Sequence, residues 1–223
     1  FDMVREICDN YDILFIMDEV MAGSGRTGKT MASKLFDANP DIITVAKGLS
    51  SGYTPMGATV CNRKVFDAIM VDGSGNFIHG HTYASNPLSC GISLKVMEII
   101  EREEFIQNCA VQGEYLMEKM QDLYKYPIVG DIRGKGLMIG MEFVKDKETK
   151  EPLDPAFNFS TKLAHESLRQ KMFLEAGSGN NRGQSGDMVM FGPPFIVTEA
   201  EIDKMVDRFD SVLTKIEREY GIA

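Results

Sequence analysis

Two short apolar runs mark the first part of the chain, at positions 13–17 (I-L-F-I-M) and 42–46 (I-I-T-V-A). Brief runs of this kind predict buried strands. The segment between them has the length of one βαβ crossover, so we expect the two strands to be parallel and to end at the same edge of a sheet. Asp18 follows the first strand and Lys47 follows the second. Open α/β sheets bind ligands at that edge, so an acid and an amine are expected in one crevice.

The remaining patterns of the first part predict one more strand and several helices. Positions 58–61 predict a third strand, 30–36 a short helix and 65–70 a helical turn, while 23–28 form a Gly-rich loop. Pro87 opens a helix that continues to about position 104. Its expected buried side consists of Leu88, Ile92, Val96, Ile99 and Ile100. All strands of this part are expected to be parallel and buried.

From position 105 the pattern changes. Apolar residues at helical spacing predict a second long helix, which ends at Tyr126-Pro127. Positions 137–144 alternate and predict a strand with one solvent-facing side. A helix at 159–171, a flexible polar loop at 177–186 and a strand at 188–191 follow. Thr198 and Glu201 form a capping box, which opens a last helix. Its expected buried residues are Ile202, Met205, Val206, Phe209, Val212, Leu213 and Ile216.

This change predicts a domain boundary near Glu103. Residues 1–103 are expected to form an α/β domain with a mostly parallel sheet, and residues 104–223 a small α+β domain. With 43% apolar residues, a chain of 223 residues can bury a real core. The chain starts at Phe1 inside a predicted helix, which suggests the later part of a longer protein.

Charge and cysteine content narrow the function classes. The formal charge of −9 argues against nucleic acid or an anionic membrane as the main partner. No run of eighteen apolar residues occurs, so we expect a soluble, cytoplasmic protein. Cys8, Cys61, Cys90 and Cys109 lack paired short spacing and a histidine cluster. Reduced core thiols are therefore expected, and no metal site.

The Gly-rich segment G-S-G-R-T-G-K-T (23–30) matches the sequence pattern of the phosphate-binding loop of nucleoside triphosphatases. Such a loop should leave its strand directly, whereas five residues, D-E-V-M-A, intervene here. We therefore disfavour that class of enzyme and interpret the segment as a loop whose glycines let the backbone turn.

Asp18 and Lys47 offer a different chemistry. Burial of a lysine side chain against apolar strands disfavours the charged form and frees the amine as a nucleophile. An amine nucleophile forms a Schiff base with a carbonyl cofactor or substrate. A nearby carboxylate can keep a pyridinium nitrogen protonated, which makes a pyridoxal ring an electron sink. Alone, either residue is more often a cap or a solvated charge; together at one edge they indicate this chemistry.

Five segments resemble the class III pyridoxal-phosphate-dependent aminotransferases of fold type I. They are D-E-V-M-A-G-S-G-R-T-G-K, P-D-I-I-T-V-A-K-G-L-S-S-G-Y-T-P-M-G-A, H-G-H-T-Y-A-S-N-P-L-S-C, I-R-G-K-G-L-M-I-G-M-E-F and P-P-F-I-V-T-E-A-E-I-D, in family order from Asp18 to Asp203. The resemblance implies the later half of a cofactor-binding large domain (1–103), then the C-terminal small domain (104–223). It implies transfer of an amino group from an amine or amino acid to a keto acid.

The resemblance also assigns roles to single residues. It implies that Lys47 forms the Schiff base with pyridoxal phosphate and then moves the proton, and that Asp18 pairs with the pyridine nitrogen. Val20 would pack under the ring. Thr82 would reach the cofactor phosphate of the neighbouring subunit, with His81 beside it, so that a homodimer shares its active sites. No metal is implied.

Two departures from the family pattern stand out. Members are about twice as long, and their first half supplies the phosphate cup and the aromatic ring above the cofactor, so this chain alone is expected to be incomplete. Position 190 is commonly Arg in members that grip an α-carboxylate, and here it is Met190. Arg182, in the predicted loop, is the candidate substitute. Alternatives are another pyridoxal-phosphate reaction on this scaffold (decarboxylation or aminomutation) or a catalytically incompetent fragment.

Overall fold

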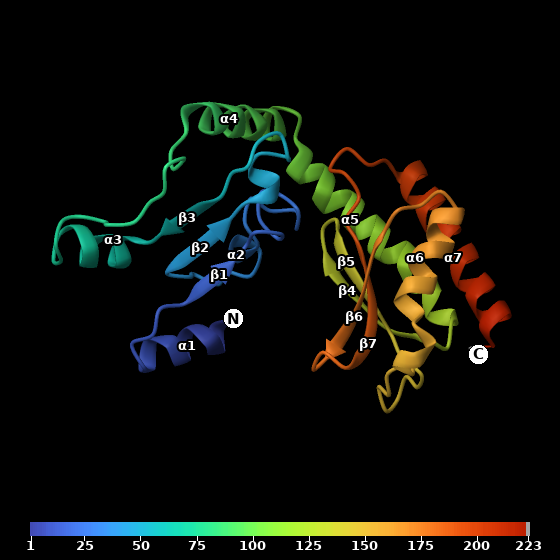
Figure 1. Cartoon of the computed structure of the whole chain (residues 1–223). Helices are drawn as coiled ribbons and strands as arrows, with labels where there is room; N and C mark the ends of the chain where they lie inside the picture. The colour runs from blue at the N-terminus through green and yellow to red at the C-terminus, as the bar shows by residue number, and fades with distance from the viewer. Residues whose placement is uncertain (222–223) are drawn as a thin grey trace. The chain divides into compact units, whose positions relative to one another are not determined.

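The computed structural model describes residues 1–221, which divide into two compact units (Figure 1). One unit is Phe1–Gln107 and the other Asn108–Ala223. The turn near Glu103, where the sequence placed a boundary, joins helices α4 (Pro87–Arg102) and α5 (Phe105–Gln121). The assignment of 1–103 and 104–223 to a large and a small domain remains a prediction.

The first unit contains a three-stranded sheet in the order β1 (Ile16–Asp18), β2 (Ile42–Val45), β3 (Ala58–Cys61). Strands β1 and β2 are parallel, in the register that pairs Asp18 with Thr44, so the expected parallel pairing is confirmed. Strand β3 is antiparallel to β2, which corrects the expectation that all three strands are parallel. The reason is the connection: residues 46–57 contain only the short 3-10 helix η1 (Lys47–Leu49) and no crossover helix.

Burial of the first apolar run differs from the expectation. Phe15 is buried, but Ile13, Leu14 and Ile16 are exposed, Ile16 at 55%. The strand itself begins only at Ile16. The expectation of a buried strand is therefore wrong for most of this run, because no part of residues 1–221 covers these side chains.

Four helices belong to the first unit: α1 (Asp2–Asn10), α2 (Ala32–Leu35), α3 (Arg63–Met70) and α4. The buried carboxylate of Asp41 ties α1 to the sheet, because it accepts hydrogen bonds from the Arg5 guanidinium, the Phe15 amide and the Asn62 side chain. In α4, Val96 and Ile100 are buried as expected, whereas Leu88 is 72% exposed, which corrects that position. Leu88 lies in the first turn, where Asn86 caps the helix.

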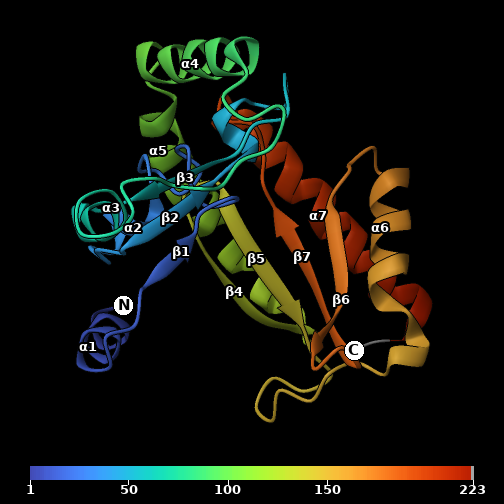
Figure 2. The same cartoon turned by 60° about the vertical axis from the view of Figure 1, so that its left-hand side comes forward.

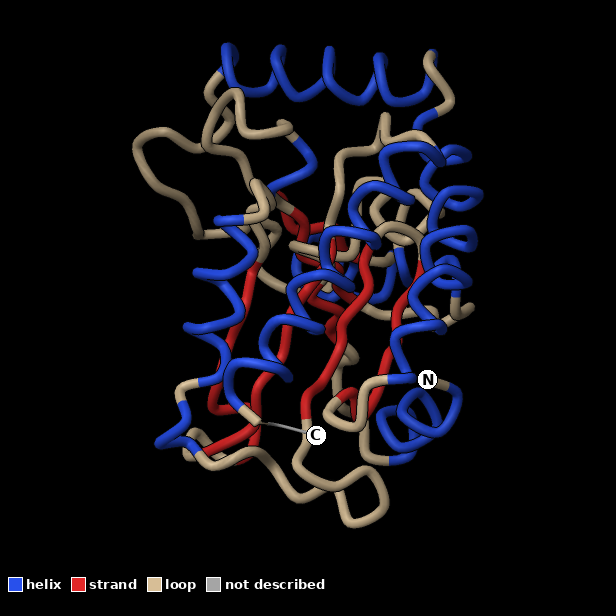
Figure 3. Tube along the Cα trace, turned by 90° about the vertical axis from the view of Figure 1, so that its right-hand side faces the viewer, coloured by secondary structure: helices blue, strands red, loops and turns tan. Residues whose placement is uncertain are grey.

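The second unit is a four-stranded antiparallel sheet with helices on one face. The strand order is β4 (Val129–Lys135), β5 (Met138–Phe143), β7 (Ser185–Phe191), β6 (Glu175–Asn181). Helices α6 (Phe159–Arg169) and α7 (Glu199–Tyr220) lie side by side over one face of this sheet (Figures 1, 2 and 3). Two short 3-10 helices, η2 (Asp122–Lys125) and η3 (Pro155–Phe157), lie in the connections.

The core of this unit follows the predicted periodicity. Leu137, Ile139, Met141 and Phe143 are all buried, which confirms the alternating strand. Five of the seven expected α7 residues are fully buried and the other two pack against the core: Ile202, Phe209, Val212, Leu213 and Ile216, with Met205 and Val206. The predicted capping box is present, since the Thr198 hydroxyl accepts from the Glu201 amide and the Glu201 carboxylate accepts from the Thr198 amide.

Residues 177–186, expected to be a flexible loop, instead form most of the β6–β7 hairpin. Its glycines permit this: Gly179, Gly183 and Gly186 have φ of +89°, +76° and +91°. Strand β6 is an edge strand that pairs only with β7. Its Gly, Ser and Asn residues resemble a loop, because an edge strand buries little and needs no apolar side chains on both faces.

The burial of the cysteines differs in part from the expectation. All four cysteines are free, but only Cys109 is buried; Cys61 and Cys90 are exposed, so the expectation of core thiols holds for one residue.

Within residues 1–221, every helix is too short or too polar to span a membrane.

Candidate active site

Asp18 ends strand β1, and one of its carboxylate oxygens is held by two donors. Oδ1 accepts a hydrogen bond from the Val20 amide at 3.0 Å and from the Thr44 hydroxyl at 3.3 Å. Within residues 1–221, Oδ2 has no hydrogen-bond partner, and the side chain is exposed. The carboxylate is therefore anchored through one oxygen and offers the other to a donor such as a protonated ring nitrogen.

Lys47 begins η1, two residues after β2 ends, and its backbone is unusual. Its φ is +40°, in the left-handed region that costs a non-glycine residue about 1–2 kcal/mol. Such conformations gather at functional sites, where the surrounding structure enforces them. Lys47 is exposed, which corrects the expectation of an amine buried against the strands. No acidic side chain forms an ion pair with it in the described part of the chain.

The parallel pairing of β1 and β2 brings these two groups to one edge. Thr44 is the register partner of Asp18, and Lys47 follows Thr44 by three residues. The parallel register therefore sets the acid and the amine at the carboxyl ends of two neighbouring strands, as the sequence predicted.

The Gly-rich loop packs against the Lys47 turn. Ser24 is buried, has a φ of +55°, and lies beside Gly48, where an added Cβ would be 3.0 Å from the Ser24 Cβ. The structure shows that Ser24 occupies the space next to Gly48, so the loop supports the turn that presents the lysine.

The same loop has no amide cradle for a phosphate. The amides of Gly23, Gly25, Arg26 and Gly28 donate to the carbonyl oxygens of Glu19, Thr30, Gly23 and Gly25. A phosphate-binding loop needs these amides to point at the ligand. The buried Glu19 carboxylate accepts from the Ala32 and Ser33 amides at the start of α2, so that helix end is also occupied. The Gly-rich loop therefore gives no support to a nucleoside triphosphatase function.

Thr82 and His81 lie apart from this cluster in the hydrogen-bond network. Both are exposed in the segment before α4, and within residues 1–221 no hydrogen bond joins either to Asp18, Val20 or Lys47. The segment ends at α4, whose Ser89 hydroxyl shares a 2.8 Å hydrogen bond with the Thr54 hydroxyl in the loop after Lys47. Among the predicted site residues, the hydrogen bonds within residues 1–221 join Val20 to Asp18, and the roles of Thr82 and His81 remain predictions.

Arg182 lies in the turn of the β6–β7 hairpin, before Ser185, whereas Met190 lies near the far end of β7. The predicted flexible loop is therefore largely a paired hairpin, with Arg182 at its turn. The role of Arg182 as the residue that pairs with a substrate carboxylate in place of an arginine at position 190 remains a prediction.

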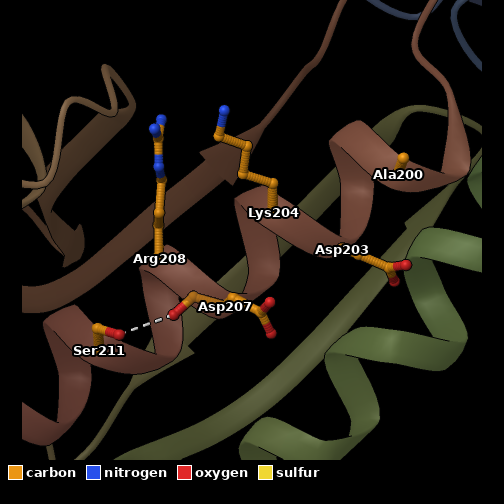
Figure 4. Close-up of a pocket in the computed structure, with 6 residues that line it drawn as sticks. All are labelled: Ala200, Asp203, Lys204, Asp207, Arg208 and Ser211. Atoms are coloured by element: carbon orange, nitrogen blue, oxygen red, sulfur yellow. Dashed lines mark hydrogen bonds between the residues drawn. The ribbon is translucent and has the colours of Figure 1, made fainter.

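A shallow depression on α7 is not an active-site candidate. Lys204 and Arg208 point to one side of the helix and Asp203 and Asp207 to the other (Figure 4). Ser211 donates to the backbone oxygen of Asp207. All its lining residues come from this one helix: Ala200, Asp203, Lys204, Asp207, Arg208 and Ser211. It is a stretch of helix surface and contains none of the predicted site residues.

The arrangement fits pyridoxal phosphate at two points. The ring nitrogen and the aldehyde of that cofactor lie on opposite sides of one ring, and the unpaired Asp18 oxygen and Lys47 amine suit them respectively. Sequence reasoning missed Thr44 and Ser24. Aligning the predicted strands 13–17 and 42–46 end to end would set Thr44 opposite Phe15, so the pairing of Thr44 with Asp18 comes only from the observed register. Ser24 had no signal beyond its glycine neighbours.

Comparison with known proteins identifies the family. A family model described as Aminotransferase class-III matches residues 1–213. The taurine–pyruvate aminotransferase of Bilophila wadsworthia is 38% identical over 226 residues, which cover 100% of this chain and 49% of that protein. The chain spans about half the length of the relatives it matches.

Two solved structures have the same fold. An amine transaminase from an uncultivated Pseudomonas species, in its PLP-bound internal aldimine form, gives a TM-score of 0.86 at 36% identity, covering 95% of this chain and 47% of that one. A transaminase from a study of directed evolution by ancestral reconstruction gives a TM-score of 0.90 at 33% identity, covering 98% and 47%. The α/β architecture with its C-terminal α+β part is thus that of the fold type I transaminases. The chain belongs to the class III aminotransferases.

Proposed function

We propose that this chain serves the pyridoxal-phosphate-dependent transfer of an amino group from an amine or amino acid to a keto acid. The observation that carries the proposal is the parallel β1–β2 pairing, which sets Asp18 and Lys47 at one sheet edge. Residues 1–103 would be the later half of the cofactor-binding large domain, and 104–223 the small domain.

Each site residue has a defined task. Lys47 would hold the cofactor through its amine and would then carry the proton that leaves the substrate carbon. Asp18 holds a proton at the ring nitrogen through its unpaired oxygen. Val20 packs under the ring. When bound, pyridoxal phosphate supplies a conjugated ring that accepts the electron pair of the substrate carbon.

The phosphate group needs donors from outside the Gly-rich loop, whose amides are used internally. We propose that Thr82 donates to the phosphate of a second subunit, with His81 beside it, and that the protein is a homodimer with shared active sites. The support is the surface of that segment: Phe77, Ile78 and Tyr83 are exposed there, Ile78 at 87%. Clustered exposed apolar side chains mark interaction surfaces.

The residue type at Met190 indicates which class of amino donor the site accepts. It pairs with Gly140 on β5 and Glu175 on β6, and none of these three side chains can donate a hydrogen bond to a carboxylate. An α-carboxylate that loses hydration without a partner costs several kcal/mol. We therefore propose donors without an α-carboxylate, such as simple amines and ω-amino acids, and we propose that Arg182 pairs with the carboxylate of the keto acid. The Bilophila relative is named for taurine, an amine of that kind, and for pyruvate as acceptor.

The free cysteines suggest a compartment. Exposed thiols at Cys61 and Cys90 persist in a reducing environment, so we propose a cytoplasmic location.

Borohydride reduction tests the central assignment. The full-length enzyme is incubated with pyridoxal phosphate, reduced, digested and mapped by mass spectrometry. We expect the label on Lys47 alone and no label in Lys47→Ala, with Lys34→Ala as a control that keeps it. Label on another lysine, or transaminase activity in Lys47→Ala at the wild-type level, would contradict the proposal.

A further inference from the structure

Thr44 contacts the candidate acid directly. Its hydroxyl donates to Asp18 Oδ1 at 3.3 Å, and the same oxygen accepts from the Val20 amide at 3.0 Å. Both donors therefore act on one oxygen of the carboxylate. Fixing Oδ1 in this way also fixes the direction in which Oδ2 points, since the two oxygens belong to one planar group.

The sheet register determines this contact. Asp18 pairs with Thr44 across β1 and β2, and Thr44 pairs with Thr59 across β2 and β3. Register partners present their side chains on the same face. Asp18, Thr44 and Thr59 thus form one row on that face, and only the middle residue donates to the carboxylate.

Threonine is a suitable residue type for holding the Asp18 carboxylate. A β-branched side chain on a strand has restricted rotation about χ1, so the hydroxyl of Thr44 is held toward its neighbour at low entropic cost. A loop residue in the same contact would have to be ordered first. The Val20 amide is the second fixed donor, because its position follows from the turn after β1.

We infer that Thr44 is a positioning residue for Asp18, which it orients so that Oδ2 meets the ring nitrogen of the cofactor. The inference rests on the proposed function. Without the hydroxyl, the carboxylate keeps one donor and rotates more freely, so its hydrogen bond to the ring nitrogen is made in fewer molecules. The ring nitrogen should then lose its proton at lower pH, and turnover should fall while substrate binding does not.

The experiment compares Thr44→Val, Thr44→Ser and the matched control Thr59→Val in the full-length enzyme. Thr44→Val removes the hydroxyl and keeps the branched shape, and Thr44→Ser keeps the hydroxyl. The first readout is nitrogen-15 NMR of ring-labelled pyridoxal phosphate bound to each protein, followed against pH. The second is kcat and KM for one amine and one keto acid. Thr44→Ala is a further variant should Thr44→Val fold poorly.

We expect Thr44→Val to deprotonate the ring nitrogen at lower pH and to lower kcat about tenfold with KM within about twofold, the size of one lost hydrogen bond to a charged group. Thr44→Ser and Thr59→Val should match the wild type. A Thr44→Val enzyme indistinguishable from Thr59→Val in both readouts would overturn the inference and leave the proposed function standing. A wild-type ring nitrogen that is unprotonated, or unchanged in Asp18→Asn, would overturn both.

Discussion

The side chain of Ser24 lies against the open side of Gly48, so that a Cβ at position 48 would be 3.0 Å from the Ser24 Cβ. This contact joins the Gly-rich loop to the turn that carries Lys47, whose own φ is +40°. The geometry of the candidate nucleophile therefore depends on two small residues that take no part in the chemistry.

Gly48→Ala should displace either the Ser24 loop or the Lys47 turn. We expect a destabilisation of about 1–3 kcal/mol, as for other overpacked sites, with a loss of cofactor affinity measured by fluorescence titration. The double variant Gly48→Ala/Ser24→Gly removes the opposing side chain and should recover most of that loss. Equal affinities in Gly48→Ala and the wild type would show that the turn does not depend on this contact.

Asp18→Asn should lower turnover by orders of magnitude while the protein stays folded. The neutral amide cannot hold a proton at the ring nitrogen, so the transition state loses its charge stabilisation. Steady-state kcat gives the loss, and circular dichroism melting checks the fold. As a control, Asp12→Asn alters a carboxylate on the exposed approach to β1 and should leave kcat unchanged. Near-normal turnover of Asp18→Asn would rule out its role.

Met190→Arg should change the preferred amino donor. A guanidinium at this position pairs with an α-carboxylate in a bidentate way, which methionine cannot do. We expect the ratio of kcat/KM for an α-amino acid to that for an aliphatic amine to rise more than tenfold. Met188→Arg, two residues away on the same side of β7, is the control and should not change the ratio. A wild type that already prefers the α-amino acid would contradict the proposed donor class.

Gly113 in α5 should not tolerate a side chain. An added Cβ would lie 2.3 Å from the carbonyl carbon of Gly136, in the turn between β4 and β5. Gly113→Ala should therefore cost about 3 kcal/mol of unfolding free energy in urea titration. Gly91 in α4 has nothing within 4 Å of the same position, so Gly91→Ala should be neutral or stabilising by up to about 1 kcal/mol. Similar midpoints for the two variants would be inconsistent with this packing.

The second unit should lose stability in acid, because the buried Glu166 carboxylate becomes protonated. Burial alone would raise its pKa, but hydrogen bonds from Lys215 at 2.8 Å and Arg169 at 3.0 Å outweigh burial and lower the pKa below its ordinary value of 4.5. A lowered folded-state pKa contributes stability that is present above pH 4.5 and is lost as the pH falls through the folded-state value.

Chemical unfolding at a series of pH values measures this contribution. Glu166→Gln should flatten the decline of stability below pH 4.5 relative to the wild type. Lys215→Met leaves the buried carboxylate with one partner and should cost about 1–3 kcal/mol at neutral pH. Parallel pH profiles in Glu166→Gln and the wild type would refute the assignment.

Elements whose burial follows a regular period could be predicted from the amino-acid sequence. The alternation from Leu137 to Phe143 and the stripe from Ile202 to Ile216 predict one strand and one helix, and both are buried as the pattern requires. The crossover length between Asp18 and Lys47 also determined the parallel pairing of β1 and β2. Periodicity and loop length are local properties of the chain. They can be read from the sequence because positions that face the core carry apolar residues and positions that face solvent carry polar ones.

Contacts between residues far apart in the sequence could not be predicted in the same way. The contact of Thr44 with Asp18, the packing of Ser24 on Gly48, the reversal of β3 and the hairpin that contains Arg182 all depend on strand register and on turns. Register is set by pairing between distant segments, and a shift of one residue would turn every side chain to the other face. Residue composition likewise mispredicts β6 as a loop, because pairing with a distant segment decides its structure. Its Gly, Ser and Asn residues form a strand because β7 supplies the hydrogen bonds.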